Sequence, residues 1–462
     1  MPDISTLYST DHPTIATLQR AAIPLLADDP LDAVLDLVGD ASLVLLGEAS
    51  HGTLEFYTLR AQVSKRLVAE RGFDAIAVEA DWPDALRVSR FVQDATQGGL
   101  SGQGVDRNAE QALEGFERFP QWMWRNTEVV AFLEWLREHN AGIADRAARV
   151  GWFGLDLYSL RKSMDAVVRF LEQVDPDAAK SARERYACFD HLAEDPQRYG
   201  YATTFGMKKD CEEEVVRQLL ELTGAAARRL PGQDHPGFPD ELFYAQQNAR
   251  VARNAESYYR SMFQGRDESW NVRDRHMAET LSALREHIGQ CKGRPAKIIV
   301  WAHNSHLGDA RATEMGEQGQ LNLGQLVRQG YPLRDSFVLG FTTHTGSVTA
   351  ASDWDAPAES KRVVPSLPDS FERLFHDLAL PRFLLPIRGS QTVAAALDGR
   401  RLERAIGVIY RPETERLSHY FQADLARQFD AVIHIDQTTA LPPLERSALW
   451  HEGVPETYPW GL

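Results

Sequence analysis

The chain has 462 residues, of which 43% are hydrophobic and 25% are charged, and its formal net charge is −16. This composition is typical of a globular protein with a large core, and no apolar run approaches the roughly 20 residues needed to cross a bilayer. The excess of acidic residues would repel phosphates, so neither nucleic acid nor a membrane is an expected partner.

The lack of a recognisable signal peptide and the pattern of the cysteines favour a cytoplasmic location. The N-terminal segment lacks the basic and then apolar regions of a signal peptide. The three cysteines, Cys188, Cys211 and Cys291, form no CxxC pair and cannot all be paired within one chain. A reducing compartment therefore fits, and zinc bound through thiolates is not expected.

The first part of the chain, to about residue 158, alternates strand and helix patterns. Residues 42–48 form a continuous apolar run, which is typical of a buried parallel strand. Helical periodicity then continues to Gly72, a C-cap signal, and residues 73–80 read as the next strand. This order predicts a βαβ unit and a parallel sheet. Further elements in this part are helices from Leu31, from Pro83 and over 120–140, a Gly-rich loop at 96–104, and a strand at 149–156.

The remaining chain divides into a helical and a mixed part. Residues 160–290 show amphipathic helices and no strand pattern, which indicates a helical cover or insertion. Strand patterns return at 296–302, 337–341, 347–351, 383–387, 405–410 and 431–435. We therefore predict an α/β fold: one domain over 1–462, with a central, largely parallel sheet flanked by helices.

Polar side chains gather where the predicted strands end. Glu48 and His51 follow the first strand in GEASHG, and Glu79 follows the second in VEADWP. Asp156 and Tyr158 end the third strand, and His303 and His306 follow a later one in WAHNSH. Because ligands of open α/β sheets bind at the carboxyl ends of strands, we expect these groups to converge on one pocket.

These residue types suit hydrolysis by activated water. A neutral imidazole is a good general base near neutral pH, and a carboxylate can orient it. We expect His51 to be the base, with Glu79 and Glu48 orienting its ring. His303 or His306, with Arg60, would bind the carbonyl oxygen or position the substrate. Four tryptophans could line the cleft, although core packing is the simpler interpretation: Trp82, Trp122, Trp124 and Trp301.

Three other interpretations remain open. Ser50 could be a nucleophile, but GEASHG does not match the G-x-S-x-G elbow, and Ser347 has no elbow spacing either. The histidines and acids are also ligand types for zinc or manganese, although the HExxH spacing is missing. The chain could instead be a binding protein that keeps an inherited pocket.

The same segments resemble the erythromycin esterase family. The motifs GEASHG, VEADW, GLDLYSL, SWNVRDRHMAETL and WAHNSH carry the resemblance, which extends from about residue 31 to 435. It implies a hydrolase that opens macrolide lactones or similar esters without a metal or other cofactor.

The resemblance also implies the site residues. The family's catalytic histidine matches His51, and the acids match Glu48 and Glu79. The arginine of the following helix matches Arg60, and the two later histidines match His303 and His306. Asp156 and Tyr158 are expected to contact the substrate.

Overall fold

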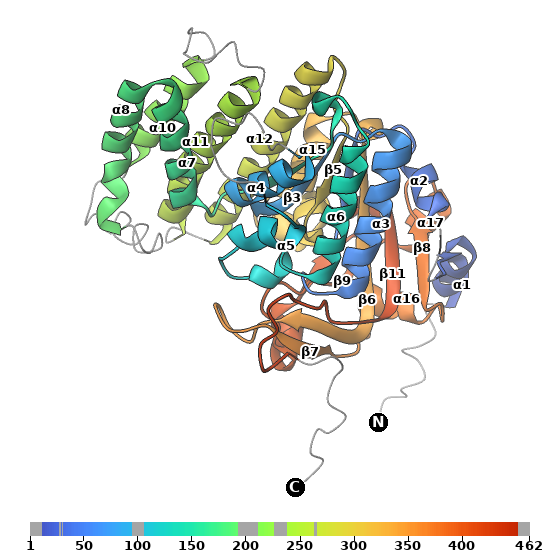
Figure 1. The fold of residues 1–462 in the computed structure, drawn as a ribbon. Coiled ribbons are helices and arrows are strands. Elements are labelled where there is room, and N and C mark those ends of the chain that lie inside the picture. The colour runs from blue at the N-terminus through green and yellow to red at the C-terminus, as the bar shows by residue number, and fades with distance from the viewer. Residues whose placement is uncertain are drawn as a thin grey trace. The chain divides into compact units, whose positions relative to one another are not determined.

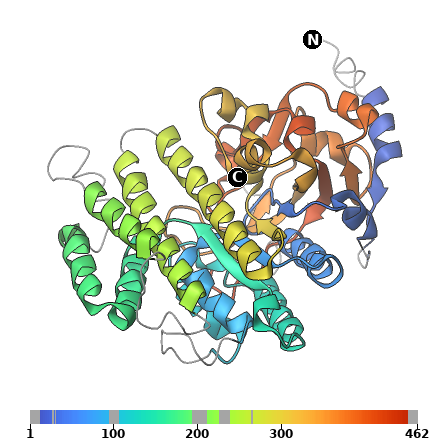
Figure 2. The same cartoon turned by 90° about the horizontal axis from the view of Figure 1, so that it is seen from above.

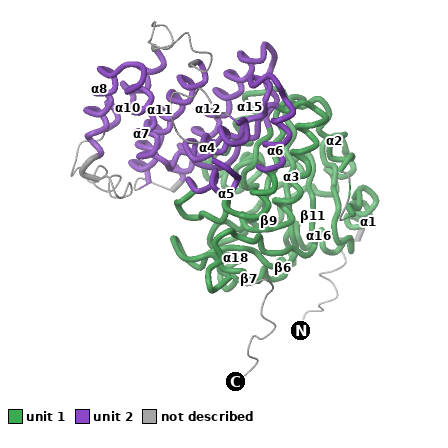
Figure 3. Tube along the Cα trace, viewed as in Figure 1, with its two compact units in different colours: residues 1–73, 116–132, 299–462 green, residues 74–115, 133–298 purple. Residues whose placement is uncertain are grey.

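The computed structural model describes residues 12–26, 29, 31–94, 106–192, 211–225, 238–262 and 266–450. It divides into two compact units (Figure 3): unit 1 contains residues 1–73, 116–132 and 299–462, and unit 2 contains residues 74–115 and 133–298. The Gly-rich loop predicted at 96–104 lies outside the described residues.

Unit 1 is built on a mixed sheet whose central strands are parallel (Figure 1). The strands of this sheet lie in the order β1 (Ile23–Pro24), β8 (Arg382–Pro386), β11 (Ala431–Thr438), β6 (Ser336–Ala350), β2 (Leu43–Leu46) and β5 (Ile298–Trp301). β6 pairs in parallel with both β2 and β11. β8 pairs antiparallel with β11, and β7 (Glu359–Val363) pairs antiparallel with β6. The four residues of β2 are all buried, as their apolar run predicts.

Helix α3 (Leu54–Arg71) follows the turn after β2 and lies along the unit 1 sheet in Figure 1. It ends at Gly72, whose φ of 64° is the left-handed conformation of a C-cap glycine. Other helices of unit 1 are α1 (His12–Ala21), α2 (Asp32–Val38), α13 (Asn304–Leu307), α14 (Glu314–Glu317), α15 (Leu323–Gly330), α16 (Phe371–His376), α17 (Gln391–Ala396), α18 (Glu415–Ser418) and α19 (Leu425–Gln428).

Unit 2 combines a parallel strand pair with a helical assembly. β3 (Ala75–Asp81) pairs in parallel with β4 (Gly151–Asp156). Its helices are α4 (Trp82–Val92), α5 (Ala109–Ala112), most of α6 (Thr127–Ala141), α7 (Leu160–Val174), α8 (Pro176–Tyr186), α10 (Glu212–Ala225), α11 (Phe238–Ser261) and α12 (Arg266–Lys292). The described residues between 160 and 292 contain no strand, which confirms the helical insertion (Figure 2). Its helices share an apolar core that includes Val167, Leu171 and Ala252.

The prediction of a strand at 405–410 is wrong. Ile406 and Tyr410 are buried with Val348 and Val363, but this segment makes only isolated bridges, Ser50 to Ile406 and Ala351 to Ile409. Its apolar pattern therefore reflects burial without a continuous ladder. The two strands that do form a ladder nearby are β9 (Arg401–Arg404) and β10 (Tyr420–Ala423), which pair with each other. The segments 337–341 and 347–351 belong to a single long strand, β6.

Two findings bear on location. None of the helices in the described part of the chain combines the length and apolarity needed to cross a bilayer. Cys188 and Cys211 form a disulfide, which leaves Cys291 outside any disulfide. Because disulfides are uncommon in a reducing cytoplasm, this pair does not support the cytoplasmic location, which stays a prediction.

Candidate active site

His51 and Glu48 form the centre of the candidate site, in the turn between β2 and α3. The Oε1 atom of Glu48 lies 2.9 Å from Nδ1 of His51, and both side chains are buried. An ionised carboxylate only accepts hydrogen bonds, so the imidazole donates from Nδ1. This leaves the lone pair of the neutral ring on Nε2, which is the arrangement of a general base.

Asn304 fixes the turn that carries these residues. Its backbone N–H donates to the carbonyl of Glu48 at 2.8 Å, and its side-chain amide donates to the carbonyl of Phe341 at 2.7 Å. A Cβ atom at Gly47 would lie 2.1 Å from Oδ1 of Asn304 and 3.1 Å from the carbonyl oxygen of Leu339, so a larger residue would displace the Asn304 amide. The first glycine of GEASHG and the asparagine of WAHNSH are therefore complementary parts of one contact.

His303 lies beside His51, with 4.8 Å between the ring centroids. Its Nδ1 atom accepts the backbone N–H of Ser305 at 3.2 Å and lies 2.9 Å from the Ser305 hydroxyl. Because Nδ1 accepts, the hydrogen of the neutral ring is on Nε2. The structure thus brings together two imidazoles with opposite tautomers: His51 can take a proton and His303 can donate a hydrogen bond. His306, on the short helix α13 that follows His303, is also buried.

Arg60 supports Glu48 from within the core. Its Nη2 atom lies 2.8 Å from Oε2 of Glu48, and its guanidinium lies over the rings of Tyr57 and Trp301, at 4.3 and 5.0 Å from the centroids. The sequence analysis expected Arg60 to bind the carbonyl oxygen or position the substrate, but the side chain is fully buried. Its contacts indicate that Arg60 positions the carboxylate of Glu48, which in turn positions the imidazole of His51.

The alternative serine nucleophile finds no support in the local geometry. The Ser50 hydroxyl forms a hydrogen bond with the hydroxyl of Thr53. The hydroxyl of Ser347 accepts the backbone N–H of Ala440 at 2.9 Å. The four tryptophans that could have lined a cleft are core residues, because all of them are buried: Trp82, Trp122, Trp124 and Trp301.

Glu79 and Asp156 lie in unit 2, where Arg273 links them. Arg273 donates to Oε1 of Glu79 at 2.7 Å and makes a two-pronged contact with the Asp156 carboxylate, from Nη2 at 2.7 Å and from Nε at 3.0 Å. The register of β3 against β4 shifts between Val78 and Asp81, a bulge next to Glu79. Sequence reasoning gave Glu79 the first role in orienting His51. The acid in contact with Nδ1 of His51 is Glu48.

Sequence reasoning missed Arg273, although its segment carries part of the family resemblance. An arginine on an amphipathic helix usually faces solvent, so only the buried acids at the end of the strand pair could have suggested its role. Its guanidinium also lies 5.1 Å from the ring centroid of Tyr158, whose hydroxyl is 3.3 Å from that of Tyr258. On the same helix, burial lowers the pKa of His276 to about 3, so this histidine stays neutral.

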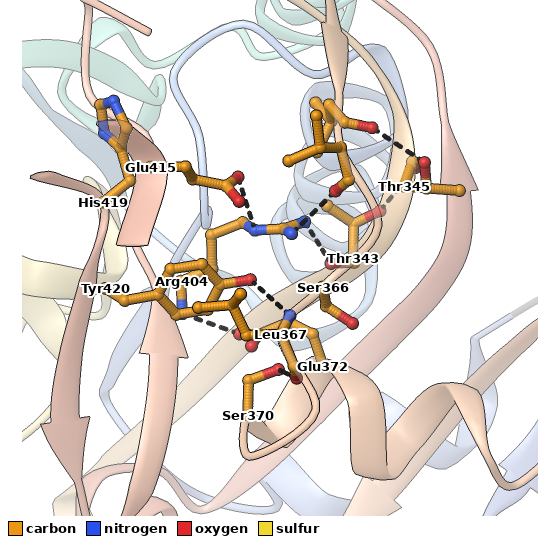
Figure 4. A network of polar contacts seen from close by, with 12 residues as sticks. Thr343, Thr345, Ser366, Leu367, Ser370, Glu372, Arg404, Glu415, His419 and Tyr420 are labelled. Atoms are coloured by element: carbon orange, nitrogen blue, oxygen red, sulfur yellow. Dashed lines mark hydrogen bonds and ion pairs between the residues drawn. The ribbon is translucent and has the colours of Figure 1, made fainter. Parts of the chain in front are cut away.

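A second buried polar network in unit 1 is structural. Arg404 donates to the carbonyls of His344 at 3.0 Å and Val364 at 2.8 Å, and its Nε lies 3.2 Å from Glu415 (Figure 4). Its backbone N–H donates to Glu372 at 2.9 Å. These contacts with main-chain carbonyls tie β6 and β9 together, and we assign the network no chemical role.

Glu403, next to Arg404, gives stability a pH dependence. Burial, together with the nearby Glu372, raises the pKa of Glu403 to about 8, against the lowering effect of a hydrogen bond from Gln428. The folded state therefore keeps a proton that the unfolded state releases above its ordinary pKa, so stability falls as pH rises from about 4.5 to 8. Between pH 5.5 and 8.5, wild type should lose up to about 3 kcal/mol more than Glu403→Gln in urea unfolding. Parallel pH curves for the two proteins would contradict this expectation.

The sheet and the paired histidines define the class of protein: an α/β protein with a buried histidine–carboxylate centre beside the end of a parallel strand. The erythromycin esterase family matches residues 68–438. The chain belongs to this family, which places it among the hydrolases. The matched segment contains His303, His306 and Glu79, and Glu48, His51 and Arg60 precede it.

Relatives support this placement. The chain is 23% identical to YbfO of Bacillus subtilis, named as a hydrolase without a stated substrate, over 86% of this chain and 84% of that protein. It is 21% identical to erythromycin esterase type II of Escherichia coli, over 89% and 93% of the two chains.

Solved structures share the fold. A succinoglycan biosynthesis protein has a TM-score of 0.74 at 21% identity, over 94% of this chain and 99% of that one. An erythromycin esterase variant in an open conformation has a TM-score of 0.62 at 18% identity, over 88% and 93%.

Proposed function

We propose that this protein hydrolyses a carboxylic ester or macrolide lactone with water activated by His51 and without a covalent intermediate. The observation that carries the proposal is the pair of imidazoles whose rings are 4.8 Å apart, with Nδ1 of His51 bound to Glu48. The names of the family and of its Escherichia coli member support the substrate class.

His51 supplies the base. Its Nε2 takes a proton from water as the oxygen attacks the ester carbonyl, and Glu48 stabilises the imidazolium that forms. General-base catalysis of this kind is worth a factor of about 10² to 10⁴ in rate. The proton then passes from His51 to the leaving alkoxide, which restores the neutral base.

His303 supplies the electrophile. Its Nε2–H is the donor for the carbonyl oxygen, on which negative charge develops in the tetrahedral intermediate. The backbone N–H of Ser305 keeps the hydrogen on that nitrogen, because it occupies Nδ1. We assign substrate positioning to His306, Asp156 and Tyr158.

A hydrolysis assay with and without chelator tests the proposal. Purified protein would be given aryl esters, straight-chain esters and macrolide lactones, with products followed by mass spectrometry. We expect hydrolysis of at least one class, an unchanged rate in chelator, and one ¹⁸O atom from labelled water in the acid product. Activity that chelation abolishes and a metal restores would favour the metallohydrolase. Binding without turnover across the panel would favour the binding protein.

A further inference from the structure

A cluster of three possible metal ligands lies on the helical part of unit 2, where α11 faces α12. Asp240 is in the first turn of α11, and His287 and Cys291 are one turn apart on α12. The Nε2 atom of His287 is 2.7 Å from Oδ1 of Asp240 and 3.9 Å from Sγ of Cys291. The three ligand atoms all lie within 4.8 Å of one another.

The geometry differs from that of a cysteine nucleophile with its base. In a catalytic triad the acid holds one imidazole nitrogen and the nucleophile contacts the other. Here Asp240 and Cys291 both approach the same nitrogen, Nε2 of His287. A carboxylate, an imidazole and a thiol that converge on one point form a set of ligands around a common centre.

The imidazole is held in place for this role. The ring of Phe243, one turn after Asp240 on α11, stacks on His287 with 4.0 Å between centroids and an interplanar angle of 1°. Lys292, the residue after Cys291, forms an ion pair with Asp74 at 2.8 Å. Two of the three ligands are partly buried and Cys291 is exposed, so an ion could enter from solvent.

We propose that Asp240, His287 and Cys291 bind one Zn²⁺ ion, with water as the fourth ligand. Thiolate, imidazole and carboxylate are the ligands of protein zinc. Tetrahedral zinc needs ligand atoms roughly 3.3 to 3.6 Å apart, which small side-chain rotations would reach from the observed distances. On binding, Cys291 loses its thiol proton, and the hydrogen that His287 shares with Asp240 moves to Nδ1. The ion would fasten the start of α11 to the last turns of α12.

This site departs from the sequence expectation that zinc would not be bound through thiolates. That expectation rested on the lack of a second cysteine close in sequence. A mixed set of ligands from two helices, in which Asp240 and His287 are 47 positions apart in the sequence, does not show such a spacing.

Cobalt substitution tests the proposal on the full chain. Co²⁺ bound to a thiolate has a charge-transfer band in the near ultraviolet, and tetrahedral Co²⁺ absorbs in the visible. Because Cys188 and Cys211 form a disulfide, such a band can come only from Cys291. We expect the band to saturate at one Co²⁺ per chain and to disappear when Zn²⁺ is added.

Two variants and a matched control complete the test. Cys291→Ser should lose the charge-transfer band, and Cys291→Ser and His287→Ala should each lower Zn²⁺ affinity at least about tenfold. His139→Ala is the control, because His139 is also a helical histidine stacked on an aromatic ring, that of Trp135. It should bind Zn²⁺ as wild type does. Equal Zn²⁺ affinity in wild type and Cys291→Ser would overturn the proposal, as would a wild-type cobalt spectrum without the thiolate band.

Discussion

Replacing His51 by Gln is expected to abolish ester hydrolysis and leave the fold intact. Glutamine keeps a polar side chain of similar reach beside Glu48 but has no basic nitrogen, so water loses its proton acceptor. We expect kcat/KM to fall by a factor of about 10² to 10⁴ or more, with an unchanged circular dichroism spectrum and melting temperature. Retained turnover in a folded His51→Gln protein would reject the assignment.

A second variant separates the base from the hydrogen-bond donor. His303→Gln should also lower kcat, by about 10²-fold, because it replaces the donor to the carbonyl oxygen but leaves the base in place. Ser50→Ala is the control for a serine nucleophile and should remain within a few-fold of wild type.

Replacing Arg60 by Met is expected to cause a large loss of stability. The guanidinium and the Glu48 carboxylate are both fully buried and 2.8 Å apart. Methionine fills much of the space but leaves the carboxylate without its cation, and breaking a buried pair in this way costs about 3–5 kcal/mol. Urea unfolding monitored by tryptophan fluorescence would measure the change.

A double-mutant cycle identifies the cause of that loss. Glu48→Gln removes the carboxylate charge that Arg60→Met leaves without a cation. The double variant should therefore be at least about 1 kcal/mol more stable than the sum of the single effects predicts. Arg60→Lys provides a folded intermediate, because it keeps the charge and loses the flat contact with Tyr57 and Trp301. Strict additivity of the two changes would show that packing on the rings, and not the ion pair, accounts for the effect.

The positions of the strands along the chain could be predicted from the sequence where a strand is buried on both faces. The runs that became β2, β3, β4, β5 and β11 are continuous and apolar, and their helical connections predict parallel pairing. The antiparallel strand β7 lacked that signal. β7 (ESKRV) is polar and largely half-buried, and it is defined by its pairing with β6 rather than by its own residues.

The candidate site was only partly visible in the sequence. The residue types and the meeting of His51 with His303 followed from their positions after strands of one sheet. The hydrogen-bond partner of each imidazole nitrogen could not be predicted, because a choice between Glu48 and Glu79 depends on side-chain directions within a turn. The same reason explains why Arg60 was expected to contact the substrate and is found inside the core.

By itself, the sequence determined the α/β class and the helical insertion and supplied the candidate residues of the site, because burial and periodicity are local properties of a chain. The tertiary structure decided which acid holds His51, which tautomer each imidazole adopts, and that Asp240, His287 and Cys291 share one centre. Those outcomes depend on distances between atoms far apart in sequence, and only the packing of the folded chain fixes such distances.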